Sequence, residues 1–107
     1  MSEPLVLALV AGDVAHDALD ALRAGFEEEG VPLALERSEG RSGELGRAAA
    51  ARALLGIGIG IDAAGACAVL AASPGRSYLE APPTALRAFA QDVARVAGRR
   101  PLRRPAS

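Results

Sequence analysis

Three consecutive carboxylates, Glu27, Glu28 and Glu29, are the residues of this 107-residue sequence whose types and spacing point most directly to chemistry. They fall in the last turn of a segment with helical periodicity, where the negative end of the helix dipole disfavours acidic side chains by about 0.3 to 1 kcal/mol each. On a helical wheel Glu28 lies nearly opposite the apolar stripe and therefore faces outward. The cluster is either a solvated surface, which the residues alone favour, or a site that meets a cation or a basic partner.

A second candidate is the apolar run at residues 54–62, LLGIGIGID, in which glycines alternate with isoleucines. Its length, its β-branched residues and its lack of charge before Asp62 predict a central strand that is buried on both faces. Gly56, Gly58 and Gly60 would share one face of this strand. The missing side chains allow a helix, another backbone or a ligand to approach closely there.

The same glycines weakly fit a nucleotide-binding pattern. The spacing Gly58-x-Gly60-x-x-Ala63 resembles a dinucleotide fingerprint, and Glu80 follows about 20 residues later. That pattern needs its glycines in the turn after the strand, whereas here the isoleucines continue the strand. The sequence also contains no Gly-Lys-Ser or Gly-Lys-Thr, which excludes a P-loop. Close packing is therefore the favoured interpretation, and a small nucleotide-binding protein that uses Gly58, Gly60 and Asp62 remains an alternative.

Histidine and cysteine are each present once, which limits what they can do. His16 could act as a general base oriented by nearby aspartates, but an exposed helix residue is the favoured interpretation. A zinc site made by this chain alone is not expected, and an internal disulfide is excluded. Cys67 is expected in the core. Ser73, Ser77 and Thr84 are expected as turn or cap residues, so no catalytic residue is assigned.

Periodicity and turn residues predict the elements that must position these side chains. In chain order they are a buried strand at 5–11, a helix at 15–29 capped by Asp13, a strand at 31–36, a polar loop at 37–43, a helix at 44–53 capped by Ser42, the strand at 54–62, a hairpin strand at 66–72, an edge strand at 77–81, and a helix from an N-cap at Thr84 to a stop at Gly98. The order βαβαβββα, with one antiparallel strand late in the sheet, predicts a small three-layer α/β sandwich.

Composition limits the classes of function. Half of the residues are apolar but only three are aromatic, which argues against base stacking on single-stranded nucleic acid. A net charge of −1 leaves no basic field for a nucleic-acid partner. Neither a signal peptide nor a membrane-spanning stretch is recognisable, so we expect a cytoplasmic protein with no membrane partner. The length predicts one domain at residues 1–98, followed by an arm rich in Arg and Pro at 99–107.

The run GFEEEGVP at residues 25–32 is the most specific motif of the chain. It is accompanied by the apolar first strand with its Gly-Asp turn, by LLGIG at 54–58, by ARV at 94–96 and by PLR at 101–103. Together these stretches resemble the small subunit of diol and glycerol dehydratase reactivating factors over nearly the whole chain. The resemblance implies an α/β/α sandwich with a mixed five-stranded sheet whose fourth strand is antiparallel, in agreement with the predicted hairpin.

The resemblance implies a role in repairing an enzyme and no catalysis by this chain. Adenosylcobalamin-dependent dehydratases inactivate themselves when the cobalt–carbon bond of the cofactor breaks irreversibly and the damaged cobalamin stays bound. In this family, the small subunit leaves a large ATPase subunit that holds ADP, the dehydratase takes its place, the damaged cofactor escapes, and ATP resets the complex. The implied partners are the large subunit, in a hetero-oligomer with two copies of each chain, and transiently the dehydratase.

The resemblance also identifies the middle glutamate of the EEEG run, Glu28, as a ligand of Mg²⁺ at the interface with the large subunit. One outward carboxylate cannot hold Mg²⁺ alone, because the ion prefers an octahedron of oxygen ligands, so the partner chain and water must supply the rest. Glu27 and Glu28 are the predicted partner-binding residues, and no cofactor is expected on this chain alone. In this context the cation-binding interpretation of Glu28 is favoured over the solvated surface.

A related alternative keeps the same family but changes the role. The chain would then be a module similar to the dehydratase's own medium subunit and would contact cobalamin directly. The small nucleotide-binding protein described above is the alternative from a different class.

Overall fold

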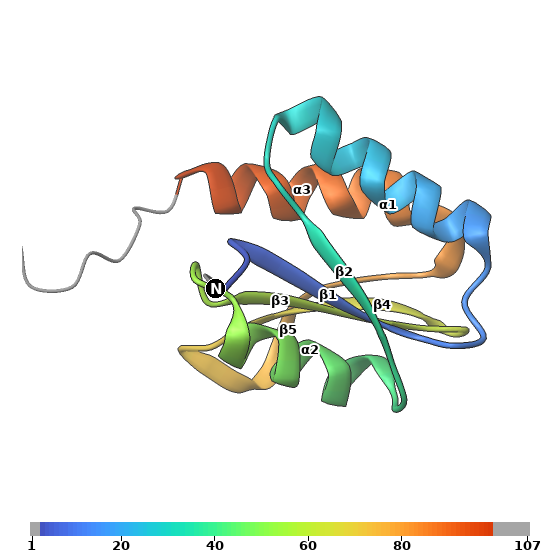
Figure 1. Cartoon of the computed structure of the whole chain (residues 1–107), viewed down its shortest axis with the longest axis horizontal. Helices are drawn as coiled ribbons and strands as arrows, with labels where there is room; N and C mark the ends of the chain where they lie inside the picture. Colours follow the sequence, from blue (N-terminus) through green and yellow to red (C-terminus); the bar gives the residue numbers. More distant parts are fainter. Residues whose placement is uncertain (1–2, 100–107) are drawn as a thin grey trace, which may run out of the picture.

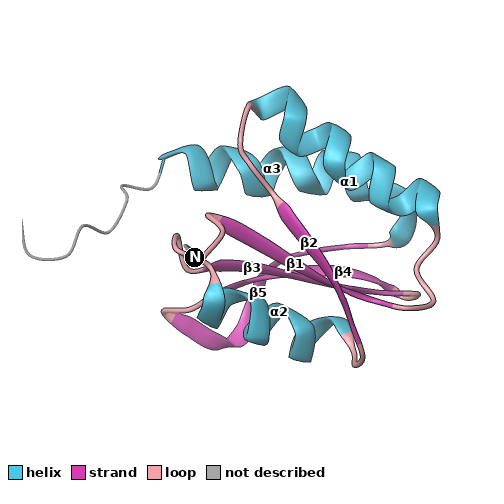
Figure 2. Ribbon diagram, viewed as in Figure 1, coloured by secondary structure: helices cyan, strands magenta, loops and turns pink. Residues whose placement is uncertain are grey.

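A five-stranded sheet lies between two layers of helices in the computed structural model, which describes residues 3–99 (Figures 1 and 2). In chain order the elements are β1 (Val6–Ala11), α1 (His16–Glu29), β2 (Ala34–Ser38), α2 (Ser42–Arg52), β3 (Ile57–Asp62), β4 (Gly65–Leu70), β5 (Ser73–Ala81), a 3-10 turn η1 (Pro83–Ala85) and α3 (Leu86–Arg99). The strand order is β2-β1-β3-β4-β5. Helices α1 and α3 cover one face of the sheet and α2 covers the other (Figure 1). The predicted three-layer α/β/α sandwich is confirmed.

The sheet is parallel except at one strand. β1 pairs in parallel with β2 and with β3, while β4 pairs antiparallel with both β3 and β5. All six residues of β1 and the first five of β3 are buried, as expected for strands that are covered on both faces. Asp62 lies opposite Gly65 across a two-residue turn, so β3 and β4 form the predicted hairpin. β4 is therefore the one reversed strand of the mixed sheet.

Helix α2 packs directly on the glycines of β3. A β-carbon added to Gly58 would lie 2.5 Å from the backbone oxygen of Gly46 and closer still to the backbone nitrogen of Ala50. A β-carbon on Gly60 would overlap the backbone oxygen of Ser42. Both glycines therefore face α2, and the helix approaches the strand backbone to backbone. The expectation of close packing at these two positions is confirmed.

Gly56 departs from that expectation. It has a φ of +69° and lies in the turn before β3, which begins at Ile57 and not at Leu54. Its amide donates a hydrogen bond to the carbonyl of Ala53, at 2.9 Å, which closes the turn at the end of α2. The glycine serves here through its left-handed backbone conformation and not through close packing.

Helices α1 and α3 also meet at a glycine. A β-carbon on Gly25 would lie 2.5 Å from the Ala90 β-carbon and 2.6 Å from the backbone oxygen of Arg87. Around this crossing the core is filled by the buried side chains of Leu22, Phe26 and Phe89. The crossing therefore fixes which residues of α3 lie beside the last turn of α1.

Three predicted helix ends differ from the structure. The N-cap of α1 is Ala15, without a side-chain hydrogen bond, because Asp13 lies two residues too early to reach the first turn. Ser42 is the first residue of α2 and not its cap. Thr84 lies inside η1, since Pro83 already has a backbone angle suited to a first helical residue.

The last helix runs through Arg99, past the predicted stop at Gly98. The remainder of the predicted arm, residues 100–107, lies outside the described residues, so the division of the chain at residue 98 stays a prediction. Across residues 3–99, no helix has the length and apolarity needed to cross a membrane.

We predict that Gly60→Ala will lower the free energy of unfolding by roughly 3 kcal/mol. The added methyl group would meet backbone atoms of α2, which cannot move aside as a flexible side chain can. Chemical denaturation measures the effect. The matched control is Gly75→Ala in β5, where an added β-carbon has no atom within 4 Å. If Gly60→Ala unfolds at the same denaturant concentration as Gly75→Ala, the tight contact between α2 and β3 does not exist in solution.

Candidate functional site

The three glutamates at the end of α1 form an ordered turn, called here the acidic turn (Glu27, Glu28 and Glu29). Gly30 follows it with a φ of +71°, and its amide donates to the carbonyl of Glu27 at 3.1 Å. The next amide, that of Val31, donates to the carbonyl of Phe26 at 3.1 Å. This pair of bonds is a Schellman motif, which satisfies helix carbonyls that would otherwise have no donor. The end of the helix is thus fixed, and so are the directions of its last side chains.

Glu28 faces α3. Its Oε1 accepts a hydrogen bond from Arg87 Nε at 2.7 Å, and its Oε2 accepts one from Gln91 Nε2 at 3.2 Å. The side chain of Glu28 stays 40% exposed. Glu28 therefore lies at the surface as predicted, but both of its oxygens are engaged by the neighbouring helix.

Arg87 offsets the unfavourable helix dipole at Glu28. Its hydrogen bond, and next its positive charge, lower the pKa of the Glu28 carboxyl, with a smaller contribution from Gln91. Glu28 is therefore ionised at neutral pH and bonded to a cationic group. The acidic turn is a charged surface whose central member already holds a cation supplied by its own chain.

The flanking glutamates differ from Glu28. Glu29 is the least exposed of the three and pairs with Arg95 Nη2 at 3.3 Å. Glu27 is exposed, and no ion pair to it is found within residues 3–99. Of the two predicted partner-binding residues, Glu27 thus presents its carboxylate to solvent, whereas that of Glu28 is shared with α3.

The described residues fit Mg²⁺ only as a ligand shared with another chain. Residues 3–99 contain no group of three or more His, Cys, Asp or Glu side chains arranged to hold a metal. Glu28 can offer a carboxylate oxygen of the kind that Mg²⁺ prefers, provided that Arg87 moves aside. A complete site requires oxygen ligands from a partner chain and from water.

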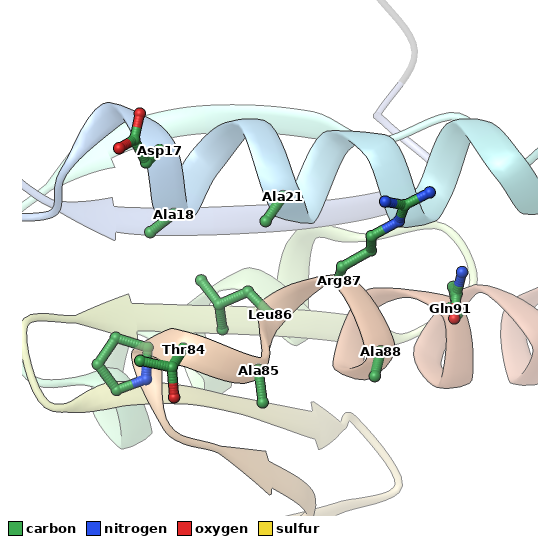
Figure 3. A pocket seen from close by; sticks show the side chains of 10 residues that line it. Asp17, Ala18, Ala21, Thr84, Ala85, Leu86, Arg87, Ala88 and Gln91 are labelled. Atoms are coloured by element: carbon green, nitrogen blue, oxygen red, sulfur yellow. The ribbon is translucent and has the colours of Figure 1, made fainter.

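A shallow groove of about 570 Å³ continues from this surface toward the start of α1 (Figure 3). Ala18 and Ala21 of α1 line one side, and η1 with the first turns of α3 lines the other. Arg87 extends from α3 toward α1 in this view. Arg87 and Gln91 line the groove and also bind Glu28, so the groove and the acidic turn form one continuous surface.

The glycine-rich strand does not offer an open nucleotide site. Helix α2 covers the face of Gly58 and Gly60, and Asp62 is used as a structural acceptor. Its carboxylate accepts hydrogen bonds from the amides of Ser42, Ala64 and Gly65 at 2.8, 2.9 and 3.2 Å. The bond from Ser42 is the main cause of a lowered pKa at Asp62. Asp62 thus joins the start of α2 to the turn between β3 and β4.

The single histidine and cysteine have the positions expected from the sequence. His16 is exposed at the first residue of α1. Cys67 is a free thiol buried in β4, and burial raises its pKa. The expectation of turn or cap residues is wrong for Ser73 and Ser77, because both lie in strand β5, where Ser77 donates a hydrogen bond to Glu80 at 2.5 Å.

Comparison with known proteins assigns the family. A family model described as dehydratase medium subunit matches residues 3–102. The chain belongs to the dehydratase medium-subunit family. None of the curated proteins matches its sequence.

Two solved structures share the fold of this family member. A chain of a glycerol dehydratase reactivase is 25% identical with a TM-score of 0.80, and the match covers 94% of this chain and 97% of that one. A chain from the structure of a diol dehydratase-reactivating factor complexed with ADP and Mg²⁺ is 21% identical with a TM-score of 0.81, and the match covers 96% and 100%. The family resemblance inferred from the GFEEEGVP run is confirmed.

Sequence reasoning missed Arg87 and Gln91 as the partners of Glu28. They are 59 and 63 residues away along the chain, so no local pattern connects them with the acidic turn. One signal was available. Arg87 and Gln91 are four positions apart, so they share one side of their helix, next to its buried stripe. It could show that the pair is exposed, but not which helix lies against it.

We predict that Asp62→Asn will flatten the pH dependence of stability at acidic pH. The pKa of Asp62 is lower in the folded state than in the unfolded chain, so the ionised carboxylate stabilises the fold above the unfolded pKa of about 3.9. That stabilisation is lost as the pH falls through the folded pKa. The neutral amide should cost about 1 kcal/mol at neutral pH and progressively less in acid.

Denaturation of wild type and variant over a series of pH values measures the difference. Asp13→Asn is the matched control, since Asp13 is exposed and caps no helix. A constant difference between wild type and Asp62→Asn at all pH values would contradict the assignment.

Proposed function

We propose that this chain is the small subunit of an ATP-dependent, chaperone-like reactivating factor for adenosylcobalamin-dependent diol or glycerol dehydratase. It would act in the cytoplasm, together with a large subunit that hydrolyses ATP. The chain itself would carry out no catalysis. Its task would be to bind a surface of the large subunit reversibly.

The observation that carries the proposal is the reciprocal match with the glycerol dehydratase reactivase chain. The two chains align over 94% and 97% of their lengths, with a TM-score of 0.80 at 25% identity. The same elements are therefore present in both, without a large insertion or a missing layer on either side. A match of this extent supports equivalent roles more strongly than a shared core would.

The proposed mechanism is subunit exchange. With ADP on the large subunit, the small subunit dissociates and the dehydratase binds the surface that it leaves. The damaged cobalamin then escapes, and ATP restores the original complex, with two copies of each chain. Exchange of this kind requires a docking surface that is alternately exposed to water and buried in an interface. Exposed charged side chains meet this requirement better than a large apolar patch does.

We propose the acidic turn and the adjoining groove as this docking surface. Glu27 would contact the large subunit directly, and Glu28 would provide one oxygen ligand to a Mg²⁺ ion shared with it. When bound, the ion would supply a positive charge between carboxylates of the two chains. Arg87 holds Glu28 at 2.7 Å and would have to release it, which makes the guanidinium a competitor of the metal.

A module that resembles the dehydratase medium subunit and contacts cobalamin directly is the second candidate. The family model that matches residues 3–102 carries that description and supports it. Both solved chains described above belong to reactivating factors, which favours the first candidate. A gene for a large ATPase subunit next to this one would decide between them.

The function is tested by co-expressing the chain with the large ATPase subunit and adding the complex to a dehydratase loaded with cyanocobalamin. We expect release of cyanocobalamin that requires both ATP and Mg²⁺, and no release by either subunit alone. If this chain binds cyanocobalamin itself and the large subunit adds nothing, the medium-subunit alternative is correct.

We predict that Glu28→Gln will weaken association with the large subunit about tenfold in Mg²⁺ and leave it unchanged in EDTA. Arg87→Gln should have the opposite effect and lower the Mg²⁺ concentration needed for association, because it removes the competing cation. Calorimetry of the two purified subunits measures both effects.

The matched control is Glu39→Gln, an exposed carboxylate in the loop between β2 and α2. If Glu28→Gln changes the affinity equally in Mg²⁺ and in EDTA, Glu28 is a contact residue and not a metal ligand.

A further inference from the structure

A small cavity of about 270 Å³ lies on the α1 side of the sheet, where β1 and β2 end, and no part of the proposed function uses it. Its base is apolar and is formed by Val10, Leu19 and Leu35. The rest of its lining consists of His16, Arg23, Arg37 and one acidic residue, Glu36. Ligands of open α/β sheets commonly bind at the carboxyl ends of the parallel strands, which is where this cavity lies.

Each basic residue reaches the cavity for a local reason. His16, Leu19 and Arg23 follow one another at helical spacing and therefore share one side of α1. Arg37 comes from β2, where it alternates with residues that face α2. Its Nη1 donates to the carbonyl of Ala11 at 3.1 Å, which holds the guanidinium over the end of β1 beside the turn into α1.

Glu36 is the one acidic residue of the lining, and its carboxylate is directed to the other side of the sheet. Both carboxylate oxygens of Glu36 are bonded to Arg52 of α2, at 3.0 and 2.8 Å. Asp20 makes only a long, exposed pair with Arg23, at 3.8 Å. Asp13 and Asp17 line two other hollows of the surface. The two arginines of the lining outnumber its one carboxylate, so the cavity carries a net positive charge although the whole chain has a charge of −1.

We propose that this cavity binds the phosphate group of a small molecule. Guanidinium groups match the geometry of phosphate oxygens, and two of them on different elements can hold one phosphate from two directions. An imidazole can complete the set as a further donor. The volume suits a phosphate group with a few bound waters better than a whole nucleotide, so any larger part of the ligand would extend into solvent.

The proposal does not depend on the function in reactivation. Arg37 and His16 lie where β1 and β2 end and α1 begins, whereas the acidic turn lies at the far end of α1. A ligand in the cavity would therefore leave the acidic turn free.

The test is a titration of the isotope-labelled full chain with inorganic phosphate at constant ionic strength, followed by amide NMR. We expect saturable shifts confined to the turn after β1, the first turns of α1 and the end of β2. Arg37→Gln and Arg23→Gln should each raise the dissociation constant about tenfold. The matched control is Arg76→Gln on β5, which removes the same charge far from the cavity and should leave the dissociation constant unchanged.

A parallel titration with ADP distinguishes a free phosphate ion from the phosphate group of a larger ligand. Equal affinity would assign the site to the phosphate group alone, and tighter binding of ADP with the same shifted amides would assign it to a nucleotide phosphate. Shifts spread over the whole surface, or an equal loss of affinity in Arg76→Gln and Arg37→Gln, would overturn the proposal.

Discussion

Close contacts at glycines determine how the helices pack on both sides of this sheet. On one face α2 lies against Gly58 and Gly60 of β3, and on the other α1 crosses α3 at Gly25. None of these three glycines has room for a β-carbon, so α2 lies close to β3 and α1 lies close to α3. A core built from alanine, valine, leucine and isoleucine with few aromatic residues is compatible with such short distances, because small side chains fill the narrow layers.

The crossing at Gly25 also determines the candidate site. It lies one turn before Glu28, so the acidic turn is held against α3 at a fixed distance from Arg87 and Gln91. The result is a carboxylate that is exposed, ionised and already bonded to a guanidinium. If a metal ion and a partner replace that guanidinium, association would exchange one ionic contact for another. A modest net change in free energy suits a subunit that must bind and leave in turn.

Sequence reasoning reached the order of the elements, the single reversed strand and the packing of a helix on Gly58 and Gly60. Uninterrupted apolar runs and the two-residue turn after Asp62 are local signals, and the buried strands match them. The starts of the helices were harder to predict, because Asp13 and Thr84 are good caps by residue type but lie in the wrong place relative to the first turn. The pairing of Glu28 with Arg87 could not be predicted, since it depends on how two distant helices cross.

The central claim, that this chain and the dehydratase alternate on one surface of the large subunit, is tested most directly by competition. A fluorescently labelled chain bound to the large subunit would be titrated with dehydratase, first in ADP and then in ATP, while its anisotropy is recorded. The account predicts that the dehydratase displaces the labelled chain in ADP and fails to displace it in ATP. A stable complex in which one large subunit holds both the chain and the dehydratase would contradict it.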